Sequence, residues 1–150
     1  MNTKPDFEVL THEECVRLLE GSHVGRVAWL RGGRPILVPV NYAWDGDAVA
    51  LRTDPGAKLD ELTQGDIAFE IDHIDVDTRT GWSVLVVGAA TEVTEVEWPL
   101  MAGPLKNLQT WAPGARDHWL RLSPTNISGR RLGHVPDASH NPFWRLSASE

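Results

Sequence analysis

The residues best suited to hold an anion lie between Arg52 and Lys58, in the stretch Arg-Thr-Asp-Pro-Gly-Ala-Lys. A strand is expected to end and a helix to begin here, so free backbone N–H groups and the positive end of the helix dipole favour a negative charge. Thr53 adds a hydroxyl between the two cations. The pattern favours a phosphate site, and an ordinary helix cap flanked by solvated cations is the alternative. It is not a P-loop, whose glycine and lysine spacing differs.

A second stretch, from Gly81 to Ala90, offers a different kind of contact. It opens with Trp82 and Ser83 and continues with small and apolar residues. A broad indole ring and a hydroxyl at the start of such a strand suit a planar ligand. A plain barrel strand is the alternative explanation.

Metal and hydrolase chemistry find little support in the sequence. The six histidines are scattered without the close pairing of zinc sites. Asp72, Asp75 and Asp77 lack the glycine and the closing glutamate of a calcium loop, and no Gly-x-Ser-x-Gly elbow occurs. Cys15 falls on the apolar face of an expected helix, which favours a buried, inert thiol. We therefore expect no metal site.

The composition limits the partners and the compartment. The 150 residues suit one domain, and the net charge of −7 argues against binding to nucleic acid or an anionic membrane. One cysteine cannot form an internal disulfide, no apolar run reaches membrane-spanning length, and the first ten residues lack a signal-peptide core. A cytoplasmic protein is expected.

Alternating apolar residues predict strands that would position the two stretches. The first three strands are expected over 24–30, 34–44 and 48–52, joined by tight turns at Gly32-Gly33 and Asp45-Gly46. Pro39 cannot donate to a ladder, so its strand should be an edge or be interrupted there. The pattern is that of an antiparallel meander.

Two short helices are expected. Thr11 and Glu14 form a capping box, followed by an apolar face of Cys15, Leu18 and Leu19 and a stop at Gly21. The second helix has Asp54 as its N-cap, Pro55 at its first position, Leu59 and Leu62 on its apolar face, and Gly65 as its stop.

The second half of the chain is also expected to be mostly strand. Strands are predicted around 67–71, over 81–96 with a bulge or bend at Gly88, and over 118–132. A broken helix and loop should occupy 97–117. The tail of 133–150 carries Phe143 and Trp144, which suggests that its end docks on another surface. Long bent strands are typical of a small barrel.

These features together resemble the flavin-binding split barrels related to pyridoxamine 5′-phosphate oxidase, especially the short actinobacterial-type members. The resemblance covers about residues 10–132 and depends on the order of elements and on five phrases. These are Val24-Gly25-Arg26-Val27, Pro39-Val40-Asn41-Tyr42, Arg52-Thr53 with Gly56 and Lys58, the run from Gly81 to Ala90, and Ile127-Ser128-Gly129-Arg130-Arg131.

The resemblance implies a mainly β fold with short helices, a six-stranded antiparallel split barrel that forms a homodimer with two cofactors in clefts between the subunits. It implies three groups of cofactor-binding residues: Val38, Pro39, Val40 and Asn41 beside the flavin ring, Arg52, Thr53, Ala57 and Lys58 around the 5′-phosphate, and Trp82 and Ser83 near the ring. Arg130 and Arg131 are candidates for contacts with the partner subunit or its cofactor.

The function implied is that of an FMN-dependent oxidoreductase acting on a small molecule. Because the flavin carries the electrons, no acid–base side chain is required and none is assigned. A deazaflavin-dependent reductase of the same fold is one alternative. A non-catalytic protein that binds a flavin, haem or another tetrapyrrole is the other. The one Arg-x-His spacing, Arg116-Asp117-His118, precedes the last strand and receives no substrate role.

Overall fold

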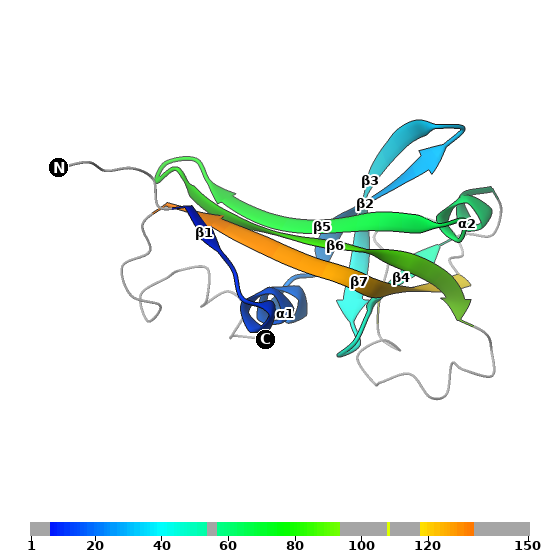
Figure 1. Cartoon of the computed structure of the whole chain (residues 1–150), viewed down its shortest axis with the longest axis horizontal. Coiled ribbons are helices and arrows are strands. Elements are labelled where there is room, and N and C mark those ends of the chain that lie inside the picture. Colours follow the sequence, from blue (N-terminus) through cyan, green and yellow to red (C-terminus); the bar gives the residue numbers. More distant parts are fainter. Residues whose placement is uncertain (1–6, 54–56, 94–107, 109–117, 134–150) are drawn as a thin grey trace.

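The computed structural model describes residues 7–53, 57–93, 108 and 118–133 (Figure 1). The expected N-cap at Asp54, most of the loop of 97–117 and the tail of 134–150 lie outside these ranges. The described elements are β1 (Phe7–Val9), α1 (His12–Gly21), β2 (Val24–Arg31), β3 (Arg34–Trp44), β4 (Val49–Thr53), α2 (Ala57–Leu62), β5 (Asp66–Asp75), β6 (Thr80–Val93) and β7 (His118–Leu132).

The strands form an antiparallel barrel. The sheet order is β1-β7-β4-β3-β2-β5-β6, and β6 also pairs with β7, which closes a ring of six strands and leaves β1 outside it. In Figure 1 the long strands β5, β6 and β7 run side by side, and the β2–β3 hairpin rises from them. The predicted six-stranded split barrel is therefore confirmed.

The first hairpins follow the predicted turns. Gly32 and Gly33 have φ of 55° and 78°, and Gly46 has φ of 102°, the positive values that tight turns need. Pro39 pairs with β2, whereas pairing of β3 with β4 begins only at Tyr42. The strand is thus an edge at Pro39, as expected, because the missing N–H faces no partner strand there.

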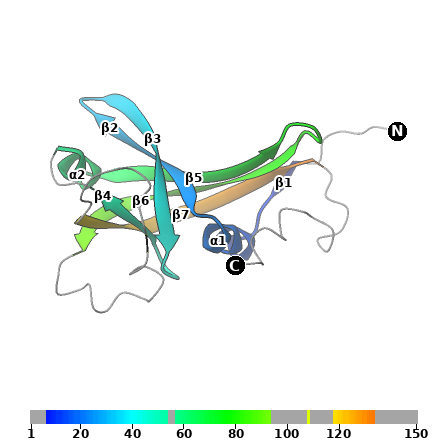
Figure 2. The same ribbon diagram turned by 180° about the vertical axis from the view of Figure 1, so that it is seen from behind.

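The bend at Gly88 is also confirmed. The register between β6 and β7 shifts between Val87 and Gly88, which marks a bulge. A Cβ atom at Gly88 would collide with the carbonyl oxygen of Ser123. Glycine is needed at this position because two backbones approach closely. Figure 2 shows the long strands from the opposite side.

The helix α1 begins with the predicted capping box. Thr11 N donates to Glu14 Oε2 at 2.8 Å, and Glu14 N donates to Thr11 Oγ1 at 3.2 Å. The apolar face is buried as expected, with Cys15 only 1% exposed. One detail differs: Gly21 is the last helical residue, and the C-cap is Ser22 in extended conformation. Gly21 is therefore not the left-handed stop that the sequence predicted.

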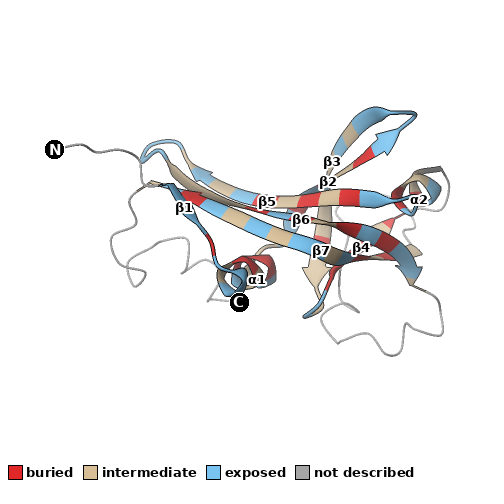
Figure 3. Ribbon diagram, in the orientation of Figure 1, coloured by how far each residue is buried: buried red, intermediate tan, exposed pale blue. Residues whose placement is uncertain are grey.

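A buried tyrosine, Tyr42, links the barrel core to α1. Tyr42 packs edge-on against Phe69, with ring centroids 4.7 Å apart, and its hydroxyl donates to the carbonyl of Leu19 at 2.6 Å. This bond ties α1 to the barrel wall and satisfies a buried hydroxyl. Buried residues alternate with exposed ones along the strands, as Figure 3 shows.

The helix α2 packs against β2 at one end of the barrel. Leu59 and Leu62 are buried, as predicted. Glu61 accepts a hydrogen bond from Trp29 Nε1 at 2.8 Å and pairs with Arg31 at 2.9 Å. These contacts fix α2, which carries Lys58, relative to the sheet.

Strand β1 is an addition to the sequence prediction. Phe7 to Val9 pair with Leu132 to Arg130, so the beginning of the described chain lies beside the end of the last strand. No helix among the described residues combines the length and the apolar character needed to cross a bilayer.

Candidate functional site

Arg52 lies near the end of β4, held between two neighbours. Its guanidinium is 5.2 Å from the centroid of the Trp119 ring, and its Nη1 donates to the carbonyl oxygen of Leu108 at 3.0 Å. Trp119 is directly opposite Arg52 in the pairing of β4 with β7. The guanidinium is therefore held in place on an indole face, as a pre-organised anion ligand requires.

Thr53 points to the other side of β4. It is 2% exposed, whereas Arg52 is half-buried, because successive side chains of a strand leave opposite faces. His118 pairs with Thr53 across the strands, and its Nδ1 is in close contact with Glu92 Oε1. The structure thus brings Arg52 and Thr53 together along the backbone and separates their side chains between the two faces.

Lys58 belongs to the first turn of α2 and is half-buried. Its Nζ is 5.6 Å from the centroid of the Trp29 ring. Ala57 is the first described residue of the helix. The end of β4 and the start of α2 therefore form one corner of the barrel, which we call the anion corner and define by Arg52, Thr53, Ala57 and Lys58.

The predicted ring-binding residues of β3 are also divided by the alternation of the strand. Val38 and Val40 pack partly against the core, and Pro39 and Asn41 face the other way. Because Tyr42 pairs with Leu51, Asn41 and Arg52 occupy the next positions on the two adjacent strands. The structure thus brings the Asn41 end of this segment to the anion corner.

Trp82 and Ser83 lie at the opposite end of the barrel. Trp82 pairs with Arg131 of β7, whereas Arg52 pairs with Trp119 of the same strand. The twelve positions between Trp119 and Arg131 correspond to roughly 35–40 Å of strand. Within one chain, these two groups of predicted residues cannot contact the same small ligand.

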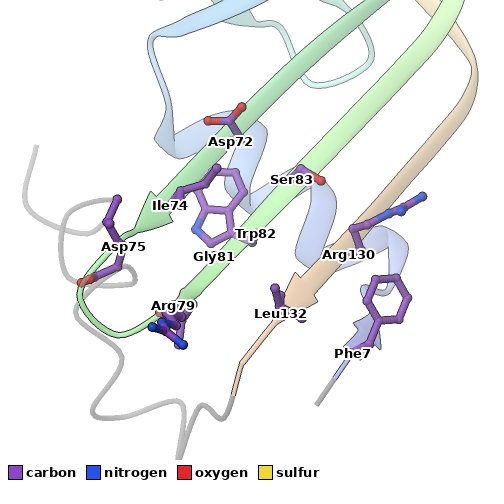
Figure 4. A pocket seen from close by; sticks show the side chains of 12 residues that line it. Phe7, Asp72, Ile74, Asp75, Arg79, Gly81, Trp82, Ser83, Arg130 and Leu132 are labelled. Carbon is purple, nitrogen blue, oxygen red and sulfur yellow. The ribbon is translucent and has the colours of Figure 1, made fainter. Parts of the chain in front are cut away.

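The surroundings of Trp82 form a groove. The imidazole of His73 stacks near the indole, with centroids 6.4 Å apart and planes 26° from parallel. The buried Nε1 of Trp82 has no acceptor among the residues that the structure describes. Trp82 and Ser83 line a hollow of about 640 Å³, together with side chains from β1, β5 and β7 (Figure 4).

A cluster of charges borders this groove. Asp72 lines it and pairs with Arg26 at 3.0 Å, and Arg26 Nη1 is 3.6 Å from Glu70. Burial, together with the adjacent Asp72 carboxylate, raises the pKa of Glu70 to about 7, although Arg26 opposes the shift. Glu70 therefore changes its charge close to neutral pH.

Comparison with known proteins assigns the family. A family model described as pyridoxamine 5′-phosphate oxidase matches residues 11–131, which is most of the chain. The chain belongs to the pyridoxamine 5′-phosphate oxidase family. The predicted resemblance is thereby confirmed at the level of the family.

Relatives within this family share most of their length with the chain. An uncharacterised protein of Mycobacterium tuberculosis is 33% identical over 129 residues, covering 82% of this chain and 84% of the relative. The structure of the FAD binding protein from Mycobacterium smegmatis is 29% identical, with a TM-score of 0.63 over 84% of this chain and 98% of the other. A putative pyridoxamine 5′-phosphate oxidase from Corynebacterium glutamicum is 25% identical, with a TM-score of 0.70 over 90% and 100%.

In this member of the pyridoxamine 5′-phosphate oxidase family, several residues around the anion corner and around Trp82 were not predicted as site residues from the sequence. Trp119 stacks on Arg52, and His118 stands opposite Thr53, although its Arg-x-His spacing received no role. Phe7 lines the groove from a strand that the sequence did not predict. Only strand pairing between distant segments reveals these neighbours, so no local signal could have found them.

Proposed function

We propose that two copies of this chain bind FMN between them and use it for redox chemistry on a small molecule. The observation that carries the flavin part of the proposal is the 29% identity with the FAD binding protein of M. smegmatis, over 84% of this chain. Family membership across residues 11–131 supports the same function.

The donors of the anion corner fit the phosphate end of a flavin. Arg52 and Lys58 supply positive charge, and the backbone of the corner supplies neutral donors, whereas the buried Thr53 side chain faces the other side of β4. Both cations lie beside indole rings, at 5.2 Å and 5.6 Å from the ring centroids. In the proposal, Asn41 and the backbone of 38–40 extend this surface toward the flavin ring.

The Trp82 end fits the ring of a flavin. The buried Nε1 of Trp82 lacks an acceptor among the described residues, and a flavin ring presents oxygen and nitrogen acceptors along its edge. The Ser83 hydroxyl adds a second polar group on the same strand.

A two-copy site explains how both ends could act on one cofactor. The anion corner and Trp82 are separated by roughly 35–40 Å of β-strand within a single chain. In a symmetric dimer, the anion corner of one copy can face the Trp82 end of the other. In a two-fold interface each such contact occurs twice, because a residue that contacts a different residue of the partner is contacted by the same residue in return. We therefore propose a homodimer with two equivalent sites.

The bound flavin would supply the electron transfer, and the protein would supply binding and orientation. Arg52 and Lys58 would neutralise the phosphate. Trp82 and the apolar side chains around it would exclude water from one face of the ring. No side chain is assigned to proton transfer.

FAD is the second candidate cofactor, because the M. smegmatis relative carries the name of a FAD binding protein. The deazaflavin and haem alternatives raised by the sequence differ from both in absorption spectrum. Absorption spectra therefore separate the deazaflavin and haem from the two flavins, and separate titrations with FMN and FAD distinguish these two.

The experiment that tests the proposal is a titration of purified protein with FMN, FAD, a deazaflavin and haem. We expect a stoichiometric complex with FMN, bleaching of its visible absorbance by NAD(P)H or dithionite, and reoxidation by a quinone. A protein that binds none of the flavins would contradict the proposal. Flavin binding without any turnover would favour the passive binder instead.

A further inference from the structure

The groove beside Trp82 has the size of a ligand site. It opens between the hairpin end of β5 and β6, the end of β7, and β1 (Figure 4). Its volume of about 640 Å³ lies within the range of small-molecule pockets. The residues that line it include Phe7, Ile74, Arg79, Trp82, Arg130 and Leu132.

The apolar part of the groove is unusually open to solvent. Phe7, Ile74 and Leu132 are 59%, 68% and 45% exposed. Single exposed apolar side chains are ordinary, but several around one hollow are typical of a binding surface. Ile74 and Leu132 both pair with Gly81, so they leave the same face of the sheet, and the side chain of Trp82, one position along, leaves the other face.

Two cations flank this apolar surface. Arg79 comes from the turn between β5 and β6, and Arg130 comes from β7 on the other side of Trp82 (Figure 4). Neither makes an ion pair with a residue that the structure describes, and the guanidinium of Arg130 is 5.5 Å from the centroid of the Phe7 ring. Both positive charges are therefore available to a ligand.

The carboxylates that also line the groove are already engaged. Asp72 Oδ2 accepts a hydrogen bond from Arg26 Nη1 at 3.0 Å, and Asp75 Oδ1 accepts one from Thr78 N at 3.0 Å. Their negative charges are thus partly compensated inside the protein. The lining holds two arginines and two aspartates, and Arg26 compensates Asp72, so an anion is favoured on the Arg130 side of the groove, next to the ring of Phe7.

The backbone at Arg79 is consistent with a role for its side chain. Arg79 has φ of 55°, and it is the one described residue other than glycine with positive φ. Glycine adopts this conformation at much lower cost. Strained positions of this kind concentrate at functional sites, where the surrounding structure holds them in place.

We infer that the groove binds a small aromatic anion, such as an aromatic carboxylate or sulfonate. The planar body lies against Phe7 and Leu132, and the anionic group pairs with Arg130, with Arg79 adding charge at the hairpin end. The site itself stands on the groove, and it rests on the proposed function only for the role of the ligand, which is the substrate beside the flavin ring.

A pair of fluorescent probes tests the charge requirement. Anilinonaphthalene sulfonate is an aromatic anion, and N-phenylnaphthylamine is its neutral counterpart of similar shape. We expect one equivalent of the sulfonate to bind the folded protein, and the neutral probe to bind at least roughly tenfold more weakly, since a charge-assisted pair is lost.

Arg130→Gln should weaken the sulfonate by roughly tenfold or more and leave the neutral probe unchanged. Arg79→Gln should have a smaller effect in the same direction. Arg34→Gln, at the tip of the β2–β3 hairpin, is the matched control and should change neither affinity. Thermal melts of each variant confirm that the fold is intact, which is expected because both groove arginines are exposed.

Three results would overturn the inference. One is equal affinity of the sulfonate for Arg130→Gln and the parent protein. Another is complete competitive displacement of the sulfonate by FMN, which would assign the groove to the flavin itself. The third is a dimer that binds no sulfonate until dilution dissociates it, which would make a second copy the occupant.

The flavin titration in the same samples keeps the two proposals apart. Arg130-dependent sulfonate binding by a protein that takes up no flavin would support the groove and contradict the proposed function. Flavin uptake without Arg130-dependent sulfonate binding would support the proposed function and contradict the anion site in the groove.

Discussion

At the scale of single residues, both cations of the anion corner lie next to a tryptophan ring. Arg52 and Lys58 each lie beside an indole ring, Trp119 and Trp29 respectively. Such stacking limits the motion of a long side chain, so less conformational entropy is lost when a ligand is bound. Trp29 and Trp119 therefore support charged side chains as well as packing in the protein interior.

Lys58→Ala tests the anion corner directly. We expect the affinity for FMN to fall by about 1–3 kcal/mol, because a charge-assisted contact to the phosphate is lost. The melting temperature of the ligand-free protein should fall only slightly, since the cation–π contact with Trp29 is worth about 0.5–1 kcal/mol. Isothermal titration and differential scanning calorimetry measure the two effects. Lys58→Arg is the control, and equal loss in both variants would remove charge as the explanation.

Glu70 gives the protein a stability that depends on pH. Its pKa is raised to about 7 from the ordinary glutamate value of 4.5, so the folded state holds this proton more tightly than the unfolded state does. Stability from this group is fully present below about pH 4.5 and is lost as the pH rises through about 7.

Glu70→Gln should remove this dependence. At about pH 8 we expect the variant to be more stable than the parent by about 1 kcal/mol, a value reduced by solvent screening of the partly exposed side chain. Urea denaturation across this pH range measures the difference. Asp66→Asn, an exposed change at the start of β5, is the control. Parallel pH profiles for the parent and Glu70→Gln would show that the Glu70 carboxyl does not titrate in this range.

At the scale of elements, the docking of α1 on the sheet depends on a glycine. A Cβ atom at Gly129 of β7 would lie 2.7 Å from Cys15 Sγ and 3.0 Å from the carbonyl oxygen of Ser83. The segment that leads into α1 is also bonded here, since Leu10 N donates to Gly129 O at 3.0 Å.

Gly129→Ala should therefore destabilise the fold by about 1–3 kcal/mol, because the overpacked helix must shift from the strand. Chemical denaturation measures the loss. The neighbouring exposed change Ser128→Ala should be nearly neutral. An Ala variant at Gly129 as stable as the parent would mean that α1 tolerates a looser position.

In the turn between β5 and β6, introducing a glycine should stabilise the fold. Arg79→Gly should raise the free energy of unfolding by up to about 1 kcal/mol, because glycine adopts positive φ without the steric cost paid by arginine. Arg79→Ala is the matched variant, since it loses the charge and keeps the strain. Melting temperatures distinguish the two, and a Gly variant no more stable than the Ala variant would rule out backbone strain at this position.

Much of this element structure could be predicted from the sequence. The observed bounds of β3 and β7, the capping box at Thr11 and the bulge at Gly88 all agree with prediction, because alternation and turn chemistry are local signals. The site could be predicted only in part. The distance between Lys58 and Trp82, and the pairing of Phe7 with Leu132, depend on contacts between remote segments, which no local pattern encodes.

At the scale of the whole molecule, the proposed site requires two chains. A consequence is that defects in different parts of the site should complement each other. Lys58→Ala and Trp82→Ala should each weaken FMN binding on their own. In a mixed dimer, one of the two sites combines the intact Lys58 of one copy with the intact Trp82 of the other.

Co-expression of the two variants with different affinity tags tests this arrangement. We expect the purified heterodimer to bind FMN at one of its two sites with parental affinity, and each parental homodimer to bind weakly at both. A monomer at all concentrations by analytical ultracentrifugation, or a heterodimer without a tight site, would contradict the shared site.

The position of β7 in the sheet also governs when the chain can acquire its structure in the cell. This last described strand pairs with β1, β4 and β6, and it provides the surface on which α1 docks. A ribosome must therefore synthesise the chain through β7 before α1 meets its docking surface. Until β7 has emerged, the nascent barrel is an open sheet with unpaired edges, and rapid pairing of β7 with these edges prevents them from pairing with neighbouring chains.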